Sequence, residues 1–466
     1  MLVLGYALAI LPYLAICAWW RKLGDGREVL FRILAVAFAI RLMLLLIPPL
    51  LSEDLWRYVW DGMHLWAGLS PYGAAPSAVS ETVFSTHYGL ELIRQEIGHP
   101  EISTIYPPMA QLSFGLATSF GPSQLLMRLM MISADLVTIG AIWSWAMATD
   151  RPPQVAALFA FAPLSVMESA VGGHIDSLGV AALTVAGALY ARGSTVRAAA
   201  AAAWAIGIKL VPILLLTYWA RHRWRVSILS LGLTLGVGLI FFCIYPVDLT
   251  GLSTFAHRWR ANDGLFAVVY YGFECVWPND GKLVELSSQA VYLSRLLVGG
   301  EVADGGVWPD ELAFASTKLV LGVLFILSLA GAVFKARSVE MFWLWVMGTL
   351  LLVSPVVHPW YLLWILPSAV LFLVKDRAGW GWVFILWSQL VWLAYLPRQE
   401  YVLSGIWTES HWTRWVQYGP VYLALLFCAY RSLSRGPLTE SRAQEELDVP
   451  MAPEDGRTLD SHNDST

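Results

Sequence analysis

The sequence predicts an all-α, polytopic integral membrane protein of roughly 11 to 13 transmembrane helices with a long first outer loop. Of its 466 residues, 57% are hydrophobic and only 14% are charged. Long apolar runs recur along nearly the whole chain, which a water-soluble core of this size would not need. Basic clusters fall at alternate ends of these runs, as expected for repeated crossings. We therefore expect the lipid bilayer as a partner and no nucleic acid.

Residues 1–20 are expected to form the first transmembrane helix, with its N-terminus outside. This stretch has no basic residue before its apolar run and an Arg-Lys pair after it, the reverse of a secretory signal. Arg21, Lys22 and Arg27 then mark the first cytoplasmic loop.

The later segments of spanning length, about 17–25 residues, follow the same rule. They lie near 29–51, 124–148, 154–171, 176–191, 226–246, 312–334, 340–356, 358–374, 380–396 and 416–430. Basic clusters at 221–225, 335–337, 375–377 and 431–435 are placed in the cytoplasm. The stretches 52–105 and 247–311 and a shorter loop at 397–415 then face outward. The two long loops are the natural places for extracytoplasmic chemistry.

The middle of the chain allows two topologies. If every apolar piece between 106 and 219 crossed fully, Arg192 and Arg197 would face outward, against the charge rule. The preferred topology makes 106–121 a short segment that does not change sides. It also breaks 197–219 at the sequence GIKLVP into two half-helices, which is tolerated where the backbone lines a cavity.

The chain divides into a membrane domain and a tail. We expect residues 1–435 to form the transmembrane domain, with outer loops at about 52–105 and 247–311. Residues 436–466 are acidic, polar and nearly free of aromatic residues, so they cannot bury enough surface to fold alone. We expect them to form a disordered cytoplasmic tail.

The sequence lacks the glycine-rich motifs that cradle nucleotide phosphates. An outward-facing transferase therefore needs its group already activated on a carrier within reach, and a lipid phosphate is such a carrier. A sugar on a polyprenyl phosphate has a leaving group that departs as an anion. Displacement with inversion then needs one general base and cations around the phosphate, and not the carboxylate pair of a glycosidase.

The stretch EDLWRYVWDGMHLWAGLSPY, at 53–72, contains a suitable base. If 53–66 is a short helix, Asp54, Tyr58 and Asp61 fall at i, i+4 and i+7 on one face, with Arg57 beside them. The alternative is a plain interfacial helix with an aromatic belt and solvated charges.

An ordered set of motifs resembles the bacterial branch of the GT-C membrane glycosyltransferases, especially polyprenyl-phosphomannose-dependent mannosyltransferase-like proteins. The motifs are SEDLWRYVWDG, AGLSPY, IYPP, ESAVGGHIDSLGV, GIKLVPILLL, NDGLF and SPVVHPWYLLWILP, and the similarity covers roughly residues 29 to 400. The resemblance implies a multi-helix fold of the GT-C type whose first long outer loop carries the acidic base. By that resemblance Asp54 is the catalytic candidate, and Glu53, Asp61 and Asp176 are alternates.

The residues expected at the donor phosphate are Arg258, Arg260, Lys209 and His358. Guanidinium forks match phosphate oxygens, although contact with lipid headgroups would explain the two arginines nearly as well. Lys209 interrupts apolar runs, which suits either a phosphate contact or a structural pair with a buried carboxylate. His358 begins a helix with Pro359 in its first turn, where an anion is favoured.

The remaining cavity candidates each have a structural alternative. The group comprises Arg57, Tyr58, Glu168, His174, Asn262, Asp263, Trp360 and Tyr361. Glu168, His174 and Asp176 either line a cavity or cap a loop at the membrane surface. Asn262 and Asp263 either bind sugar hydroxyls or form a turn. Trp360 and Tyr361 either stack on the lipid or sugar, or belong to an aromatic belt.

The sequence therefore predicts a glycosyltransferase on the outer face of the cell membrane. It would move a hexose such as mannose from a polyprenyl-phosphate donor to a lipid-linked or cell-envelope glycan acceptor, with inversion. No cofactor is assigned, and a metal between Asp54 and Asp176 is left open. The alternatives are a lipid or solute transporter and a glycan polymerase or ligase. A transporter would need paired polar helices at mid-membrane, and a polymerase an arginine-rich outer loop.

Overall fold

The structure is a computed structural model that describes residues 2–79, 90–246, 250–276, 284–285, 306–307, 309–404 and 411–434. The expected tail at 436–466 lies outside the described residues, as do parts of both long outer loops. Apart from one pair of two-residue strands, the described chain consists of helices and the turns between them.

The elements follow one another from the N-terminus to the C-terminus. The helices of the first half are α1 (Leu2–Trp19), η1 (Trp20–Lys22), α2 (Arg27–Leu44), α3 (Asp54–Trp66), η2 (Pro76–Ala78), α5 (Glu91–Gln95), α6 (Pro108–Ala117), α7 (Gln124–Ala148), η3 (Pro153–Val155), α8 (Ala156–Ala160), α9 (Pro163–Met167), the π-helix η4 (Glu168–Gly172), α10 (Asp176–Ala191), α11 (Thr195–Ile208), η5 (Val211–Leu214) and α12 (Leu215–His222). The later elements are α13 (Trp224–Ile244), α14 (Thr250–Arg258), α15 (Leu265–Val276), β1 (Val284–Glu285), β2 (Gly306–Val307), α17 (Pro309–Lys335), α18 (Val339–Val353), η6 (Pro359–Trp364), α19 (Leu366–Phe372), α20 (Trp380–Leu390), η7 (Val391–Ala394), α21 (Tyr395–Ser404) and α22 (His411–Ser434). Strands β1 and β2 pair antiparallel, with Val284 opposite Val307.

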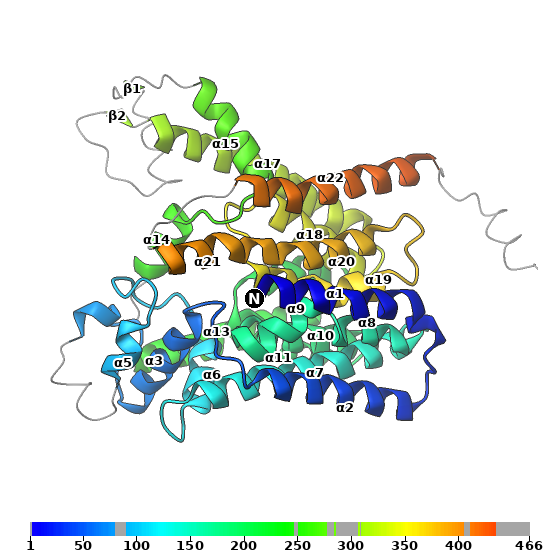
Figure 1. The fold of residues 1–466 in the computed structure, drawn as a ribbon, viewed down its shortest axis with the longest axis horizontal. Coiled ribbons are helices and arrows are strands. Elements are labelled where there is room, and N and C mark those ends of the chain that lie inside the picture. Colours follow the sequence, from blue (N-terminus) through cyan, green and yellow to red (C-terminus); the bar gives the residue numbers. More distant parts are fainter. Residues whose placement is uncertain are drawn as a thin grey trace, which may run out of the picture.

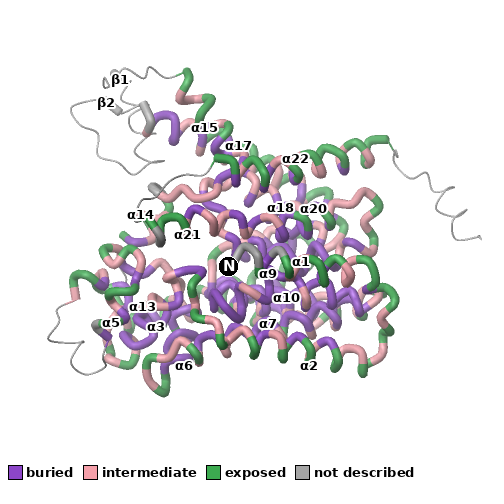
Figure 2. Tube along the Cα trace, in the orientation of Figure 1, coloured by how far each residue is buried: buried purple, intermediate pink, exposed green. Residues whose placement is uncertain are grey.

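The axes of most long helices lie roughly along the longest axis of the molecule (Figure 1). Helix α10 lies between α7 and α11, and α11 packs in turn on α13, so these four helices form a row that ends at the mostly exposed α13. Helix α3 packs on α6 at one end, while α1 turns into α2 at the other (Figure 1). Buried residues concentrate in α7, α9 and α10, whereas α2 and α22 turn exposed faces outward (Figure 2).

Three helices within the described residues are long and apolar enough to cross a bilayer: α7, α13 and residues Glu311–Lys335 of α17. Two consecutive segments, Pro153–Ala160 and Pro163–Gly172, pass the same test together, although the chain bends by 59° between them. The prediction of an all-α membrane protein is confirmed. The expected total of roughly 11 to 13 transmembrane helices stays a prediction.

The break expected at GIKLVP is present. Helix α11 ends at Ile208, Lys209 is extended at φ −152° and ψ 136°, and a new helical turn begins at Val211. The short segment expected at 106–121 contains α6, whose ten residues extend about 15 Å and cannot span a bilayer core of about 30 Å.

Glycines let large rings approach the helix axes closely. A Cβ atom at Gly187 of α10 would lie 2.1 Å from the Trp145 ring, and one at Gly179 would lie 2.3 Å from the Trp364 ring. Since no hydrophobic effect drives helices together in lipid, such close packing supplies much of their attraction. The absence of a side chain at Gly179 and Gly187 therefore allows α10 to pack closely against its neighbours.

Charged residues inside the bundle are paired across helices. Arg41 of α2 has no exposed surface, and its Nε donates a 2.8 Å hydrogen bond to Asp135 Oδ2 of α7. Its Nη1 donates to the carbonyl oxygens of Ala37 and Ala160, each at 3.1 Å. Arg151 pairs with Glu340 in the same way. These pairs tie together helices that are distant in sequence.

We expect the substitution Asp135→Ala to lower the free energy of unfolding by about 3–5 kcal/mol, because it leaves the Arg41 charge buried without a carboxylate. Chemical denaturation of the purified protein in detergent measures this change. The double variant Arg41→Met with Asp135→Ala should recover most of the loss. Glu101→Ala, which removes an exposed pair with His99, is the control and should change little. A stable Asp135→Ala variant would contradict the role given to this pair.

Candidate active site

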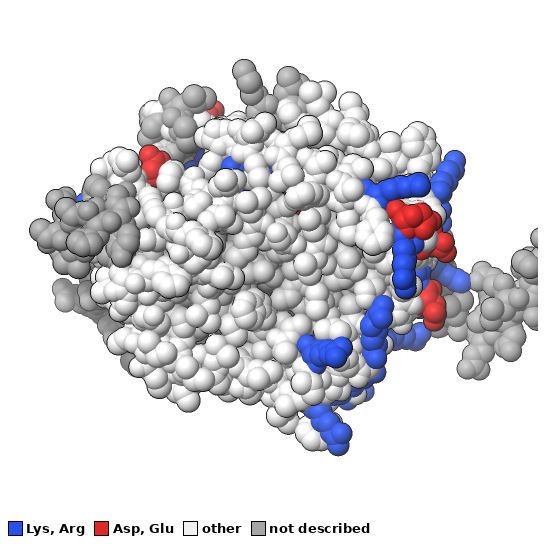
Figure 3. Space-filling view, turned by 90° about the horizontal axis from the view of Figure 1, so that it is seen from below, with Lys and Arg blue, Asp and Glu red and all other residues white. Residues whose placement is uncertain are grey.

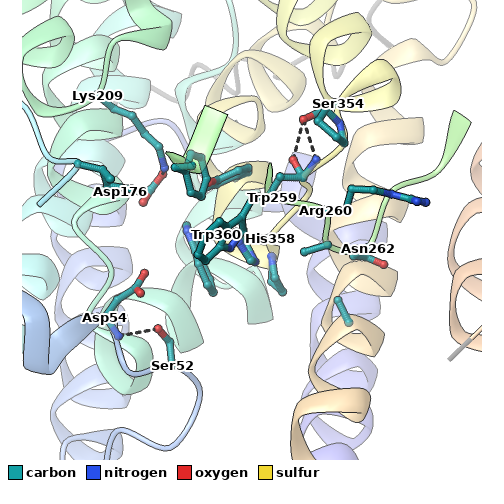
Figure 4. Close-up of a pocket in the computed structure, with 18 of the residues that line it drawn as sticks. Ser52, Asp54, Asp176, Lys209, Trp259, Arg260, Asn262, Ser354, His358 and Trp360 are labelled. Atoms are coloured by element: carbon teal, nitrogen blue, oxygen red, sulfur yellow. Dashed lines mark hydrogen bonds and ion pairs between the residues drawn. The ribbon is translucent and has the colours of Figure 1, made fainter. Parts of the chain in front are cut away.

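A cavity of about 620 Å³ opens between the two halves of the chain. Its wall is built from the start of α3, the loop before α6, the first residue of α10, the break after α11, helix α14, the loop after it, the end of α18, and η6 and α21. The sequence candidates on this wall are Glu53, Asp54, Arg57, Asp176, Lys209, Arg260, Asn262, His358, Trp360 and Tyr361. The cavity thus brings together residues from both long outer loops (Figure 4).

Asp54 is the first residue of α3, as the helix expected at 53–66 requires. Its backbone N–H donates to Ser52 Oγ at 3.0 Å, which fixes the start of the helix. Within the described part of the chain, its carboxylate makes no hydrogen bond or ion pair with another side chain. Burial raises the pKa of Asp54, and the positive charges of His174 and Lys209 partly offset that rise. Asp54 therefore presents an unengaged carboxylate to the cavity.

The neighbouring charges of α3 are engaged. Glu53 Oε1 accepts from Arg398 of α21 at 2.9 Å. Asp61 is buried, and its Oδ1 accepts from Arg57 Nε at 2.9 Å, while Gln111 Nε2 donates to its Oδ2 at 3.1 Å. Asp61 does not line the cavity, so the structure does not bring it together with Asp54 there.

Tyr58 does not line the cavity either. Its ring stacks on Phe114 of α6 with centroids 4.6 Å apart, and its edge meets Tyr106. The face expected to hold Asp54, Tyr58 and Asp61 is therefore mostly the surface on which α3 packs against α6.

Lys209 and Asp176 form an ion pair at the break after α11. Lys209 Nζ lies 2.7 Å from Asp176 Oδ1, which also accepts a hydrogen bond from Trp364 Nε1. The ammonium lies 4.0 Å from the centroid of the Tyr361 ring, a cation–π contact. Lys209 is about a quarter exposed, so it both pairs with a buried carboxylate and faces the cavity.

Arg260 lies across the cavity from Lys209. In Figure 4 its side chain extends away from Asp54 and Lys209. Its Nε donates to Asp263 Oδ2 at 2.9 Å, and Arg414 of α22 pairs with the other oxygen of Asp263 at 2.9 Å. The guanidinium lies 4.2 Å from the ring centroid of Tyr270. Asp263 is fully buried behind the wall and orients both arginines.

The loop after α14 is attached to the loop after α18. Ala261 forms an isolated parallel bridge with Val356, and Asn262 Nδ2 donates to the Val357 carbonyl at 3.0 Å. Asn262 has a φ of 51°, the left-handed conformation that a turn at Asn-Asp-Gly favours. The Arg258 side chain lies outside the described residues.

His358 occupies the position before η6, and Pro359 takes the first turn as expected. Burial, together with the nearby charge of Lys209, lowers the pKa of His358 to about 3. The imidazole is therefore neutral near pH 7 and can offer one N–H but no positive charge. Its ring lies parallel to Trp360, with centroids 4.5 Å apart.

Glu168 and His174 lie behind the wall and do not line the cavity. Both are buried, with His174 Nδ1 2.7 Å from Glu168 Oε2. The Tyr395 hydroxyl donates to Glu168, and His174 stacks on Trp360 with centroids 3.9 Å apart. Through these contacts they support Tyr395 and Trp360 on the side of the wall that faces away from the cavity.

The sequence analysis did not single out several wall residues, although its quoted motifs contain the first three: Ser52, Tyr106, Trp364, Tyr395, Arg398 and Arg414. The placement of 397–415 outside the membrane could have drawn attention to Arg398 and Arg414. Nothing local distinguishes Trp364 or Tyr395 from the other aromatic residues of the chain.

The described residues contain no group of three or more His, Cys, Asp or Glu side chains placed to hold a metal ion. At the possible metal position between Asp54 and Asp176, the carboxylate of Asp176 is already paired with the Lys209 ammonium. The wall thus carries its own cation at that point.

One family model matches the chain. It describes the N-terminal domain of the alpha-(1->6)-mannopyranosyltransferases of the MptA_B family, and it covers residues 1–224. No curated protein and no solved structure matches. The matched part supplies Asp54, Asp176 and Lys209, while Arg260 and His358 follow it. The match, which covers just under half of the chain, supports the resemblance to mannosyltransferase-like GT-C proteins noted above.

Proposed function

We propose that this protein is a multi-pass glycosyltransferase that moves mannose from a polyprenyl phosphate to a lipid-linked or cell-envelope glycan acceptor. The transfer takes place on the extracytoplasmic face of the membrane and inverts the anomeric carbon. The observation that carries the proposal is the unengaged carboxylate of Asp54 in a cavity that also contains cationic side chains. The family of residues 1–224 supports mannose as the sugar.

Asp54 acts as the general base. Its carboxylate takes the proton of an acceptor hydroxyl while the hydroxyl oxygen bonds to the anomeric carbon. The bond from that carbon to the phosphate oxygen breaks, and the lipid phosphate leaves as an anion. Lys209 and Arg260 stabilise the phosphate charge, and neutral His358 can donate a hydrogen bond. The electron pair of the broken bond remains on the phosphate, so the departing group needs no proton.

The polyprenyl donor suits both the charges and the apolar part of the wall. Leu210, Val211, Leu252, Phe255 and Leu350 line the cavity beside the charged residues. An isoprenoid chain buries apolar surface against such residues, at about 25 cal/mol per Å². A nucleotide sugar offers no comparable apolar surface.

The distribution of surface charge supports an outward-facing cavity. Lys and Arg gather at one end of the molecule, where α1 runs into α2, and much of the visible side is uncharged (Figure 3). Basic loops remain in the cytoplasm, so this end is the inner one. Helix α3, which begins with Asp54, lies toward the opposite end (Figure 1).

We expect Asp54→Asn to reduce transfer by about 10²–10⁴-fold, because it removes the general base with little change of shape. Transfer from purified polyprenyl-phosphate mannose to a membrane glycan extract measures this. Glu53→Gln is the matched control, since Glu53 is already paired with Arg398 and should cause a smaller loss. Full activity in Asp54→Asn would rule out Asp54 as the base. A wild-type protein that consumes no donor would refute the enzyme itself.

The pH dependence of kcat/KM should show an acid limb above the ordinary aspartate value of about 3.9. Since burial raises the pKa of Asp54, the base is lost to protonation at a higher pH than an exposed aspartate would be. Activity is therefore present above this pKa and falls as the pH drops through it. An acid limb at or below the ordinary aspartate pKa, measured with saturating acceptor, would contradict the raised pKa of Asp54.

Arg260→Gln should raise the KM for the polyprenyl-phosphate donor by about tenfold, which corresponds to about 1.4 kcal/mol of lost phosphate binding. The KM for the acceptor should change much less. The comparison variant Lys318→Gln alters a cation that contacts the Ala256 carbonyl and does not line the cavity. Equal changes in the KM values for donor and acceptor would show that Arg260 supports the shape of the cavity wall and does not bind the donor phosphate specifically.

A further inference from the structure

The tryptophan that follows helix α14 lines the cavity, and the transfer described above gives it no role. Trp259 comes directly after the last residue of α14 and directly before Arg260. It is partly exposed. Figure 4 shows it among the residues in the middle of the view, with Trp360 and His358. The cavity therefore contains an accessible aromatic ring whose function is unassigned.

Two other rings hold the indole of Trp259 in place. The ring centroids of Trp259 and His99 are 4.6 Å apart with their planes at 72°, so one ring presents its edge to the face of the other. Phe255, one turn earlier in α14, lies 5.5 Å from the indole with the planes at 34°. The backbone N–H of Trp259 donates to the Phe255 carbonyl at 3.3 Å. The indole is thus oriented before a ligand enters.

The contact between His99 and Trp259 joins the two long outer loops. The Gly251 N–H of α14 donates to Ser103 Oγ at 3.2 Å, and a Cβ atom at Gly251 would lie 2.3 Å from the Ser103 carbonyl oxygen. His99 has a φ of 55°, a left-handed conformation that is uncommon for residues other than glycine. The close packing at Gly251 and the turn at His99 together place the imidazole against the indole.

This contact lies at the mouth of the cavity and next to the start of α3. The His99 side chain lines the cavity although it is 63% exposed. The preceding residue, Gly98, packs against Glu53, because a Cβ atom at Gly98 would lie 2.1 Å from Glu53 Oε2. Glu53 directly precedes Asp54. The mouth at His99 and Trp259 is therefore adjacent to the segment that carries the proposed base.

The indole of Trp259 has a polar group as well as an apolar face to offer. Within the described part of the chain, no hydrogen bond involves its Nε1. The indoles of Trp343 and Trp364, in contrast, donate to protein oxygens. A pyranose ring has a face of C–H groups and a rim of hydroxyls, which suits a flat apolar ring with an N–H donor. An isoprenoid chain has no oxygen to accept that hydrogen bond.

The place at the mouth fits the acceptor better than the donor. The donor is held by its phosphate at Lys209 and Arg260 and by its lipid chain along the apolar wall, as proposed above. An acceptor glycan brings one hydroxyl to Asp54, while the rest of the glycan extends out of the cavity toward water. The sugars that extend outward pass the exposed His99 and the partly exposed Trp259.

We propose that Trp259 and His99 form an acceptor subsite at the cavity mouth. The indole of Trp259 stacks on the pyranose ring next to the one whose hydroxyl is deprotonated by Asp54. His99 supports the indole through its edge contact. The ligand is a neutral oligosaccharide of at least two hexose units. The inference rests on the proposed function and names the part of the acceptor that the cavity recognises.

The test compares an octyl mannoside with an octyl dimannoside as acceptors for the full-length protein in lipid vesicles, with polyprenyl-phosphate mannose as the donor. The wild type should show a KM about tenfold lower for the dimannoside, because only the dimannoside reaches the indole. Trp259→Ala should remove this difference by raising the dimannoside KM, while the donor KM stays within about twofold of wild type. Trp259→Phe keeps an aromatic face and should retain most of the preference.

Trp259→Leu separates stacking from simple apolar contact, and it replaces Trp259→Ala if that variant does not fold. Leucine keeps apolar volume for a lipid chain but has no flat ring, so it should also lose the preference for the dimannoside. Trp382→Ala is the matched control, because it removes an exposed indole of α20 that does not line the cavity. It should leave both acceptor KM values unchanged.

A wild type without a preference for the dimannoside, or an unchanged preference in folded Trp259→Leu, would overturn the subsite. A rise confined to the donor KM would also overturn it and would place Trp259 against the lipid chain. Binding of methyl dimannoside without donor, measured by saturation-transfer NMR, separates these failures from that of the proposed function. A wild type that consumes no donor refutes the transfer. Binding of the dimannoside that is equal in wild type and Trp259→Leu refutes the subsite alone.

Discussion

The cost of placing a charge inside a membrane-embedded bundle determines much of this structure. An unpaired charge at this depth costs at least a few kcal/mol, and the protein avoids that cost by pairing. Arg41 pairs with Asp135, Arg151 with Glu340, and Lys209 with Asp176. Each pair joins helices or turns that are far apart in the sequence. The pairs therefore act as fixed cross-links within the bundle, and the pair of Lys209 with Asp176 lies in the cavity wall itself.

Against this background Asp54 is distinctive among the charged residues of the cavity wall. Its neighbours Glu53 and Arg57 are paired, whereas its own carboxylate has no partner among the described side chains. A base must be able to accept a proton, and an ion pair with arginine would weaken it. The cavity satisfies this need by placing the compensating charges nearby without direct contact.

The sequence predicted the elements better than it predicted their contacts. Hydropathy gave the all-α membrane class, and the polar stretch after residue 52 gave helix α3 with Asp54 at its start. The break at Lys209 followed from a lysine between apolar runs. Local patterns contain no information on the pairing of Glu53 with Arg398, 345 residues away. They also could not place Glu168 and His174 behind the wall, because only the packing of η6 against this segment decides which side faces the cavity.

Displacement of the sugar with inversion is the step that requires the base, the phosphate and the cavity together. The most direct test is the anomeric configuration of the product, determined by NMR after the purified protein in lipid vesicles has used a polyprenyl-phosphate mannose of known configuration. We expect transfer with the opposite configuration in the product. Transfer with retained configuration would contradict a single displacement assisted by Asp54, and would require a covalent or otherwise two-step reaction in this cavity.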